Sequence, residues 1–91
     1  MPRRPADWMV RSDDRILETI EEEGNMTPLA LSKEGERPRL DITRNWAGQR
    51  CRELADHGLL VRLEKGLYGI TDEGIAYLEA DLDASTLDRD A

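Results

Sequence analysis

With 91 residues and a formal net charge of −7 at pH 7, the chain buries only roughly 60–65% of the surface that its unfolded form exposes, so we expect one domain. Its single cysteine and single histidine exclude an internal disulfide and leave no cluster with metal-ligand spacing, so we expect no metal or other cofactor. Because no apolar run approaches the about eighteen residues of a membrane span, we expect a cytoplasmic protein without membrane contact.

The first predicted helix spans residues 12–23. Ser12 has the side chain of a good N-cap, and apolar residues recur at helical spacing from Ile16 to Ile20. Acidic side chains in the first turn favour this start, because the helix dipole is positive there. Gly24 and the asparagine after it end the pattern.

A short helix and a longer one follow. Thr27-Pro28 is a capping residue followed by proline at the first helical position, which predicts a short helix that ends near Gly35. The longer helix begins after Asp41 or Thr43 and ends at His57-Gly58, where the glycine can take the left-handed conformation. Its predicted inward stripe consists of Ala47, Cys51 and Leu54.

After this helix the sequence changes to a β-like pattern. Residues 59–63 and 67–70 read as two short strands joined by the polar, glycine-containing turn 64–66, which predicts a hairpin. Thr71 then caps a last helix. The face of that helix that we expect to pack inward carries Ile75, Leu78 and Leu82.

This order of elements predicts a mainly α protein with a small β-hairpin (α+β). Helix, short helix, longer helix, hairpin and helix is the order of a winged helix-turn-helix, with a three-helix core, a wing and a C-terminal helix. We expect a basic N-terminal arm at residues 1–11, the winged domain at residues 12–82, and an acidic flexible tail at residues 83–91.

Several segments resemble one family. The runs CRELADHGLL, from Cys51 to Leu60, and LYGITDEGIAYLEADLD, from Leu67 to Asp83, are similar to the winged-helix repressor-like family of halophilic archaea typified by the phage phi-H repressor. The resemblance covers roughly residues 8 to 83, and it implies a sequence-specific transcriptional regulator that binds double-stranded DNA. The segment from Ser32 to Leu40 departs from the pattern, because it is longer and more charged than expected for that turn.

The third helix carries side chains suited to reading bases. Residues 37–65 hold more basic than acidic side chains, between acidic flanks, which indicates a surface for an anion. Arginine can make two hydrogen bonds to guanine, asparagine and glutamine can do so to adenine, and a glycine allows close approach. The predicted DNA-contacting residues of this helix are Arg44, Asn45, Gly48, Gln49, Arg50 and Arg52; the alternative is an ordinary solvated helix face.

Four further basic residues are candidates for contacts with DNA. We expect Arg62 and Lys65 to flank the wing and meet phosphates without reading sequence. Arg3 and Arg4 lie in the predicted mobile arm, which either reaches a minor groove or is a disordered start. We expect His57 to be a helix-end residue, with no catalytic role.

The sequence also bears on the oligomeric state of the protein and on alternatives to DNA binding. A homodimer is expected, through the flank of the first helix and the C-terminal helix at Tyr77, Leu78 and Leu82. The alternative to DNA binding is a winged-helix protein–protein interaction module that works through its acidic flanks; a positive outer face on the third helix favours DNA. An enzyme is not expected, because no nucleophile is paired with a base in a recognisable motif and no small-molecule pocket is inferable.

The strong acidity of the chain, with Lys33 and Lys65 as its only lysines, suggests a cytoplasm at molar salt. Affinity from phosphate contacts falls steeply with salt. In such a cytoplasm, base contacts and dimer symmetry would carry more of the binding.

Overall fold

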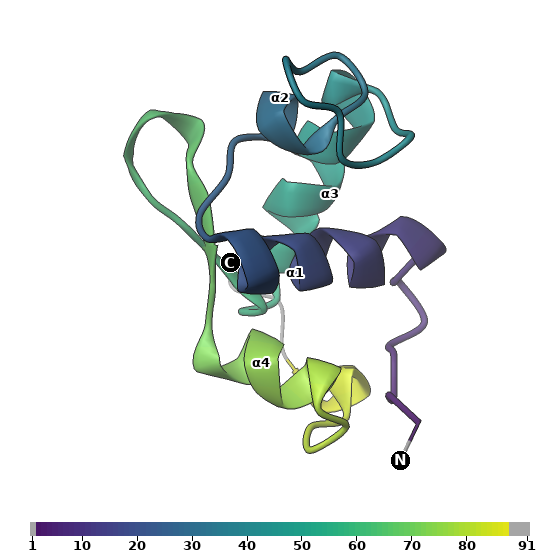
Figure 1. The fold of residues 1–91 in the computed structure, drawn as a ribbon. Coiled ribbons are helices and arrows are strands. Elements are labelled where there is room, and N and C mark those ends of the chain that lie inside the picture. The colour runs from purple at the N-terminus through teal and green to yellow at the C-terminus, as the bar shows by residue number, and fades with distance from the viewer. Residues whose placement is uncertain (1, 88–91) are drawn as a thin grey trace.

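The computed structural model describes residues 2–87 and has the predicted winged helix-turn-helix architecture (Figure 1). Its elements in chain order are α1 (Arg11–Glu23), α2 (Pro28–Leu31), α3 (Arg44–Asp56), β1 (Leu60–Arg62), β2 (Tyr68–Ile70) and α4 (Asp72–Leu78), with short 3-10 turns at Glu64–Gly66 and Ala84–Thr86. Helix α1 crosses the middle of the molecule, with α2 and α3 on one side and α4 on the other. Within residues 2–87, no helix is long and apolar enough to cross a membrane.

Helix α1 begins earlier than the sequence predicted. Its first residue is Arg11, and Val10 occupies the N-cap position that we expected for Ser12. The physical reason is that the Asp13 carboxylate accepts a hydrogen bond from the backbone N–H of Val10 at 3.1 Å, which ties down the start of the helix without a capping hydroxyl. The Ser12 hydroxyl instead accepts a hydrogen bond from the indole N–H of Trp46 at 3.2 Å.

The core lies between α1, α3 and α4. The apolar face of α1 and the predicted stripe of α3 are both buried, at Ile16, Leu17, Ile20, Ala47, Cys51 and Leu54. Helix α4 ends at Leu78, where we expected it to continue to Leu82, and its fully buried side chain is Tyr77. The Tyr77 hydroxyl donates to Asp14 of α1 at 2.6 Å, which gives this tyrosine a polar partner inside.

The hairpin is joined to the helices by a third extended segment. Strands β1 and β2 are antiparallel, with Leu60 opposite Ile70 and Arg62 opposite Tyr68. Met26, just before α2, makes two backbone hydrogen bonds with Tyr68, at 2.9 and 2.8 Å. This bridge holds the wing beside the helix-turn-helix.

The two ends of the described chain pack against each other, where we expected a mobile arm and a frayed tail. Ala6 and Ala84 are buried, and the backbone N–H of Ala84 donates to the carbonyl of Arg4 at 2.9 Å. Arg4 also bridges Asp83 in a parallel β-bridge. Small apolar residues at both ends allow this contact, which joins positions about eighty residues apart and leaves no local signal in the sequence. The last part of the predicted tail, residues 88–91, lies outside the described residues.

Candidate nucleic-acid interface

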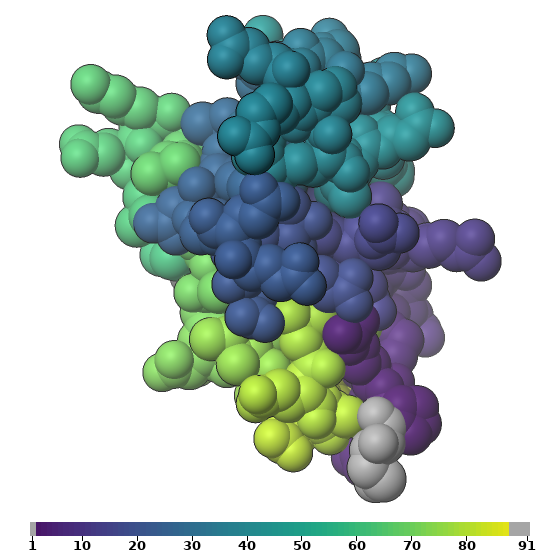
Figure 2. Space-filling model, viewed as in Figure 1, coloured from purple at the N-terminus to yellow at the C-terminus, as the bar shows by residue number. Residues whose placement is uncertain are grey.

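A groove of about 830 Å³ lies between α2, α3 and the wing. In the space-filling view the wing, in green, projects beyond the outline of the helices (Figure 2). Six of the ten predicted DNA-contacting residues line this groove: Arg44, Asn45, Gly48, Arg52, Arg62 and Lys65. The fold therefore brings side chains from α3 and from the wing to one surface.

Helix α3 presents its polar face outward because its opposite face is the buried stripe. Thr43 caps the helix, since its hydroxyl accepts a hydrogen bond from the N–H of Trp46 at 3.1 Å. Asn45, Gln49 and Arg52 are exposed on the outer face. Gln49 lies on this face without lining the groove itself.

Gly48 is buried where α3 approaches α2. A Cβ atom at this position would lie 3.4 Å from Nη1 of Arg52 and 3.9 Å from Cβ of Pro28. These are ordinary van der Waals separations, so the packing of α3 on α2 does not itself require a glycine here. Its predicted role, a close approach of α3 to a ligand, stays a prediction.

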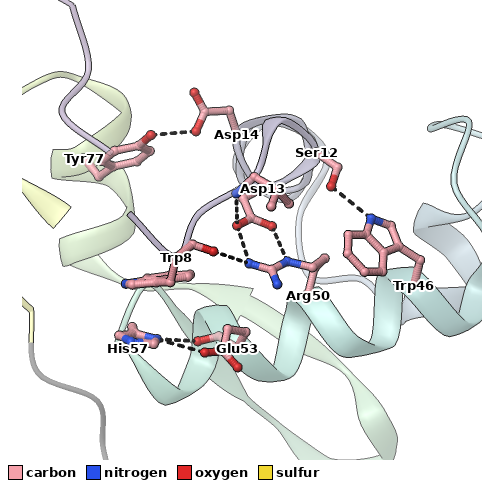
Figure 3. Close-up of polar contacts among 10 residues, drawn as sticks. Trp8, Ser12, Asp13, Asp14, Trp46, Arg50, Glu53, His57 and Tyr77 are labelled. Carbon is pink, nitrogen blue, oxygen red and sulfur yellow. Dashed lines mark hydrogen bonds and ion pairs between the residues drawn. The ribbon is translucent and has the colours of Figure 1, made fainter. Parts of the chain in front are cut away.

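Arg50 does not line the groove. Its guanidinium donates to both carboxylate oxygens of Asp13 at 2.8 Å and to the carbonyl of Trp8 at 3.2 Å (Figure 3). The Asp13 side chain is fully buried and that of Arg50 is 12% exposed. The hydrogen bond to Asp13 raises the pKa of Arg50 above its ordinary value. Arg50 therefore joins α3 to α1, and with its guanidinium engaged in this way we leave it out of the DNA-contacting set that we propose below.

The two wing residues are presented differently. The Arg62 guanidinium donates to the Tyr68 hydroxyl from two nitrogens, at 3.2 and 2.9 Å, and lies 5.6 Å from the centroid of the tyrosine ring. The hydrogen bond to Tyr68 raises the pKa of Arg62. Lys65 sits at the tip of the turn with φ of 60° and is exposed. The wing therefore offers one cation held by a side-chain contact and one exposed cation at its tip.

The remaining predicted contacts, Arg3 and Arg4, do not line the groove. The Arg3 guanidinium donates to Glu18 at 2.7 Å, to Asp14 at 3.3 Å and to the carbonyl of Leu78 at 3.0 Å. These contacts tie Arg3 to α1 and α4, and the bond to Glu18 raises its pKa above the ordinary value. Charge alone made the two arginines look like a DNA-binding arm, because the carboxylate partners of Arg3 are distant in the sequence.

The charged segment 32–40 also contributes to the groove, which the sequence did not reveal. It folds back on α2, because the N–H of Leu40 donates to the carbonyl of Leu31 at 3.1 Å and the Arg39 guanidinium donates to the carbonyl of Ala30 at 3.2 Å. Arg39 also pairs with Glu23, at the end of α1, at 2.9 Å. Glu34 lines the groove, and its carboxylate accepts a hydrogen bond from the backbone N–H of Arg44 at 2.7 Å. In the sequence, only the length and the high charge of this segment distinguished it from the turn that we expected.

The reactive side chains outside the groove have structural partners. Burial raises the pKa of the Cys51 thiol to about 12, so the thiol stays protonated and a poor nucleophile near neutral pH. The His57 ring stacks on Trp8 with 3.8 Å between centroids, and its Nδ1 lies 3.0 Å from the carbonyl of Glu53 (Figure 3). In the part of the chain that the structure describes, no three His, Cys, Asp or Glu side chains are placed to hold a metal ion.

Comparison with known proteins agrees with this geometry. The model of the winged helix-turn-helix phage repressor family matches residues 1–90. Among solved structures, the chain is similar to the PhiH1 repressor-like protein from Haloarcula marismortui, with 42% sequence identity, a TM-score of 0.88 and 98% of each chain covered. A search of curated proteins found no match. The resemblance and the fold class that the sequence predicted are thereby confirmed.

Proposed function

Because the chain belongs to the winged helix-turn-helix phage repressor family, we propose that it is a transcriptional repressor that binds specific sites on double-stranded DNA. The observation that carries this proposal is the groove where the outer face of α3 meets the wing. A recognition helix of this kind enters the major groove with its N-terminal residues against base edges. Here those residues are Arg44 and Asn45.

Base reading is assigned to the exposed polar residues of α3. Arg44 and Arg52 have the fork geometry for O6 and N7 of guanine, and Asn45 and Gln49 can bind N6 and N7 of adenine. Their spacing places them on one face of α3, over slightly more than two turns. Arg50 takes no part, because its guanidinium serves Asp13.

Positioning on the duplex is assigned to the wing. Arg62 and Lys65 meet phosphates, which fixes the register of α3 without reading sequence. The two hydrogen bonds from Arg62 to Tyr68 restrict the arginine before binding, so less side-chain freedom is lost on contact.

The charge of the α3 face favours DNA over the protein-interaction alternative. Four basic side chains, Arg44, Arg52, Arg62 and Lys65, line the groove, and one acidic side chain, Glu34, lines it with them. Acidic residues instead gather on the exposed end of α1, at Glu21, Glu22 and Glu23. A phosphate backbone is the natural partner of the first surface.

A homodimer on two half-sites about one DNA turn apart remains part of the proposal. Tyr77 is buried in the protomer and cannot form the two-fold contact that we expected of it, which leaves the partly exposed Leu78 and Leu82. Sedimentation with and without DNA measures this directly. A monomer at tens of micromolar in both states removes the dimer from the proposal.

Selection from a random duplex library at molar KCl, followed by titration of the selected site, tests the function. We expect Asn45→Ala to relax the base preference at one position by about 1–3 kcal/mol. Lys65→Ala, as the matched wing variant, should weaken all sequences alike and lower the salt slope by about 1. Equal losses on selected and scrambled duplexes for both variants contradict the assignment of α3 as the reading helix.

A further inference from the structure

One carboxylate stands in the cationic groove. Glu34 is exposed and lines the groove beside Arg44 and Asn45. Among residues 2–87, no basic side chain forms an ion pair with it. An unneutralised carboxylate repels phosphate, so it weakens the general electrostatic attraction of this surface for DNA.

The structure holds this carboxylate in place. Oε2 of Glu34 accepts the N–H of Arg44 at 2.7 Å, and the N–H of Glu34 donates to the Ser32 hydroxyl at 3.1 Å. The next residue, Gly35, is packed so closely on α2 that a Cβ there would lie 2.7 Å from the carbonyl oxygen of Leu29. Within the described chain, Oε1 of Glu34 has no hydrogen-bond partner, so an acceptor at a fixed position remains open.

One oxygen of the Glu34 carboxylate helps to cap α3, because it accepts the backbone N–H of the first helical residue. Thr43 already occupies the N-cap position, and its hydroxyl serves the N–H of Trp46. The Glu34 carboxylate covers the N–H of Arg44, at the end of α3 where a phosphate oxygen would otherwise find a favourable dipole. The carboxylate therefore disfavours a phosphate at this N–H.

We propose that Glu34 is a specificity-determining residue, whose open carboxylate oxygen accepts a hydrogen bond from the N4 amino group of a cytosine in the major groove. Glutamate and aspartate are acceptors suited to this donor. The inference deepens the proposed function and rests on it. It adds a reading residue from outside α3 and assigns a purpose to the segment that departs from the family pattern.

Glu34→Gln separates reading from capping. Glutamine keeps an oxygen for the N–H of Arg44 but turns its NH₂ donor toward the base, so preference should move from cytosine to a base with an acceptor. We expect the cytosine preference at one position of the selected site to fall about tenfold, and binding to scrambled duplex to tighten. Glu36→Gln is the matched control, because Glu36 is exposed in the same segment and does not line the groove. It removes the same charge and should leave base preference unchanged.

Glu34→Asp separates charge from geometry, since it keeps the charge and withdraws the carboxylate by one methylene. It should weaken the cytosine preference without tightening the scrambled duplex. If the wild-type protein selects an operator and both Glu34 variants select the same one with the same discrimination, the inference is overturned while the proposed function stands. If the wild-type protein selects no duplex, the proposed function itself fails.

Discussion

At the scale of single residues, the pair formed by Arg50 and Asp13 shows how one contact changes the interpretation of a surface. By helical period alone, Arg50 belongs to the flank of the reading face, and by type it suits guanine. The structure gives it a buried carboxylate on α1, thirty-seven positions away. Helical spacing places a residue on a face, but it does not reveal a partner on another helix.

Removing the Arg50 side chain should lower the stability of the fold, because the arginine serves Asp13 and is not assigned a DNA contact. Arg50→Ala leaves the Asp13 carboxylate buried without its partner, so we expect the free energy of unfolding to fall by about 3–5 kcal/mol. Arg52 lies two residues further along α3 and is exposed. Arg52→Ala should change the free energy of unfolding by less than about 0.5 kcal/mol and should weaken DNA binding. Urea denaturation measures both. Similar small losses for the two variants would show that the pair contributes little.

The buried thiol of Cys51 makes stability depend on alkaline pH. Burial raises its pKa to about 12 in the folded protein, whereas the unfolded chain loses this proton near the ordinary value of about 9. Between these values the unfolded state binds fewer protons, so stability falls as pH rises, by at most about 1.4 kcal/mol per pH unit from this group. Cys51→Ala should flatten the dependence of the unfolding free energy between pH 9 and 10. An unchanged slope in that variant contradicts the assignment.

At the scale of elements, local signals located the main helices and the hairpin. Helices α2, α3 and α4 have the N-caps Thr27, Thr43 and Thr71. These caps were predictable because a capping hydroxyl bonds an N–H only a few residues away. Two errors have different causes. The start of α1 is set by a local contact between Asp13 and the N–H of Val10, which takes the place of the capping hydroxyl that we expected. The burial of Tyr77 depends on Asp14, which is distant in the sequence. Of the groove, the face of α3 and the wing were predictable. The position of Glu34 was not, because it follows from the folding of segment 32–40 over α2.

Gly74 in α4 offers a test of how closely this helix packs, because the direction of the stability change in Gly74→Ala depends on that packing. Glycine to alanine inside a helix normally stabilises it by roughly 0.5–1 kcal/mol. Here a Cβ atom would collide with the backbone carbonyl of Leu59 and with the side chain of Ile70. We therefore expect Gly74→Ala to lower stability by about 1–3 kcal/mol in thermal unfolding. A rise in melting temperature would show that α4 is free to move away from Leu59 and β2.

At the scale of the whole molecule, the net charge of −7 and the cationic groove together determine how DNA binding depends on salt. Phosphate contacts release cations, whereas acidic flanks brought near DNA take cations up, and the two effects oppose each other in the salt dependence. We expect the affinity for the selected site to fall with KCl less steeply than the about 0.9 per phosphate contact of counterion release alone. Titrations from 0.2 to 3 M KCl check this. An ordinary slope would count against a cation-uptake role for the acidic flanks.

Duplex binding through one face of the molecule is the central claim, and amide NMR during titration with the selected duplex tests it most directly. We expect the amides of α3 from Arg44 to Arg52 and of the wing turn Glu64–Gly66 to shift, whereas those of α4 and of Glu21 to Glu23 should stay nearly unchanged. Shifts confined to the acidic surfaces, or none at any ionic strength, would contradict the account.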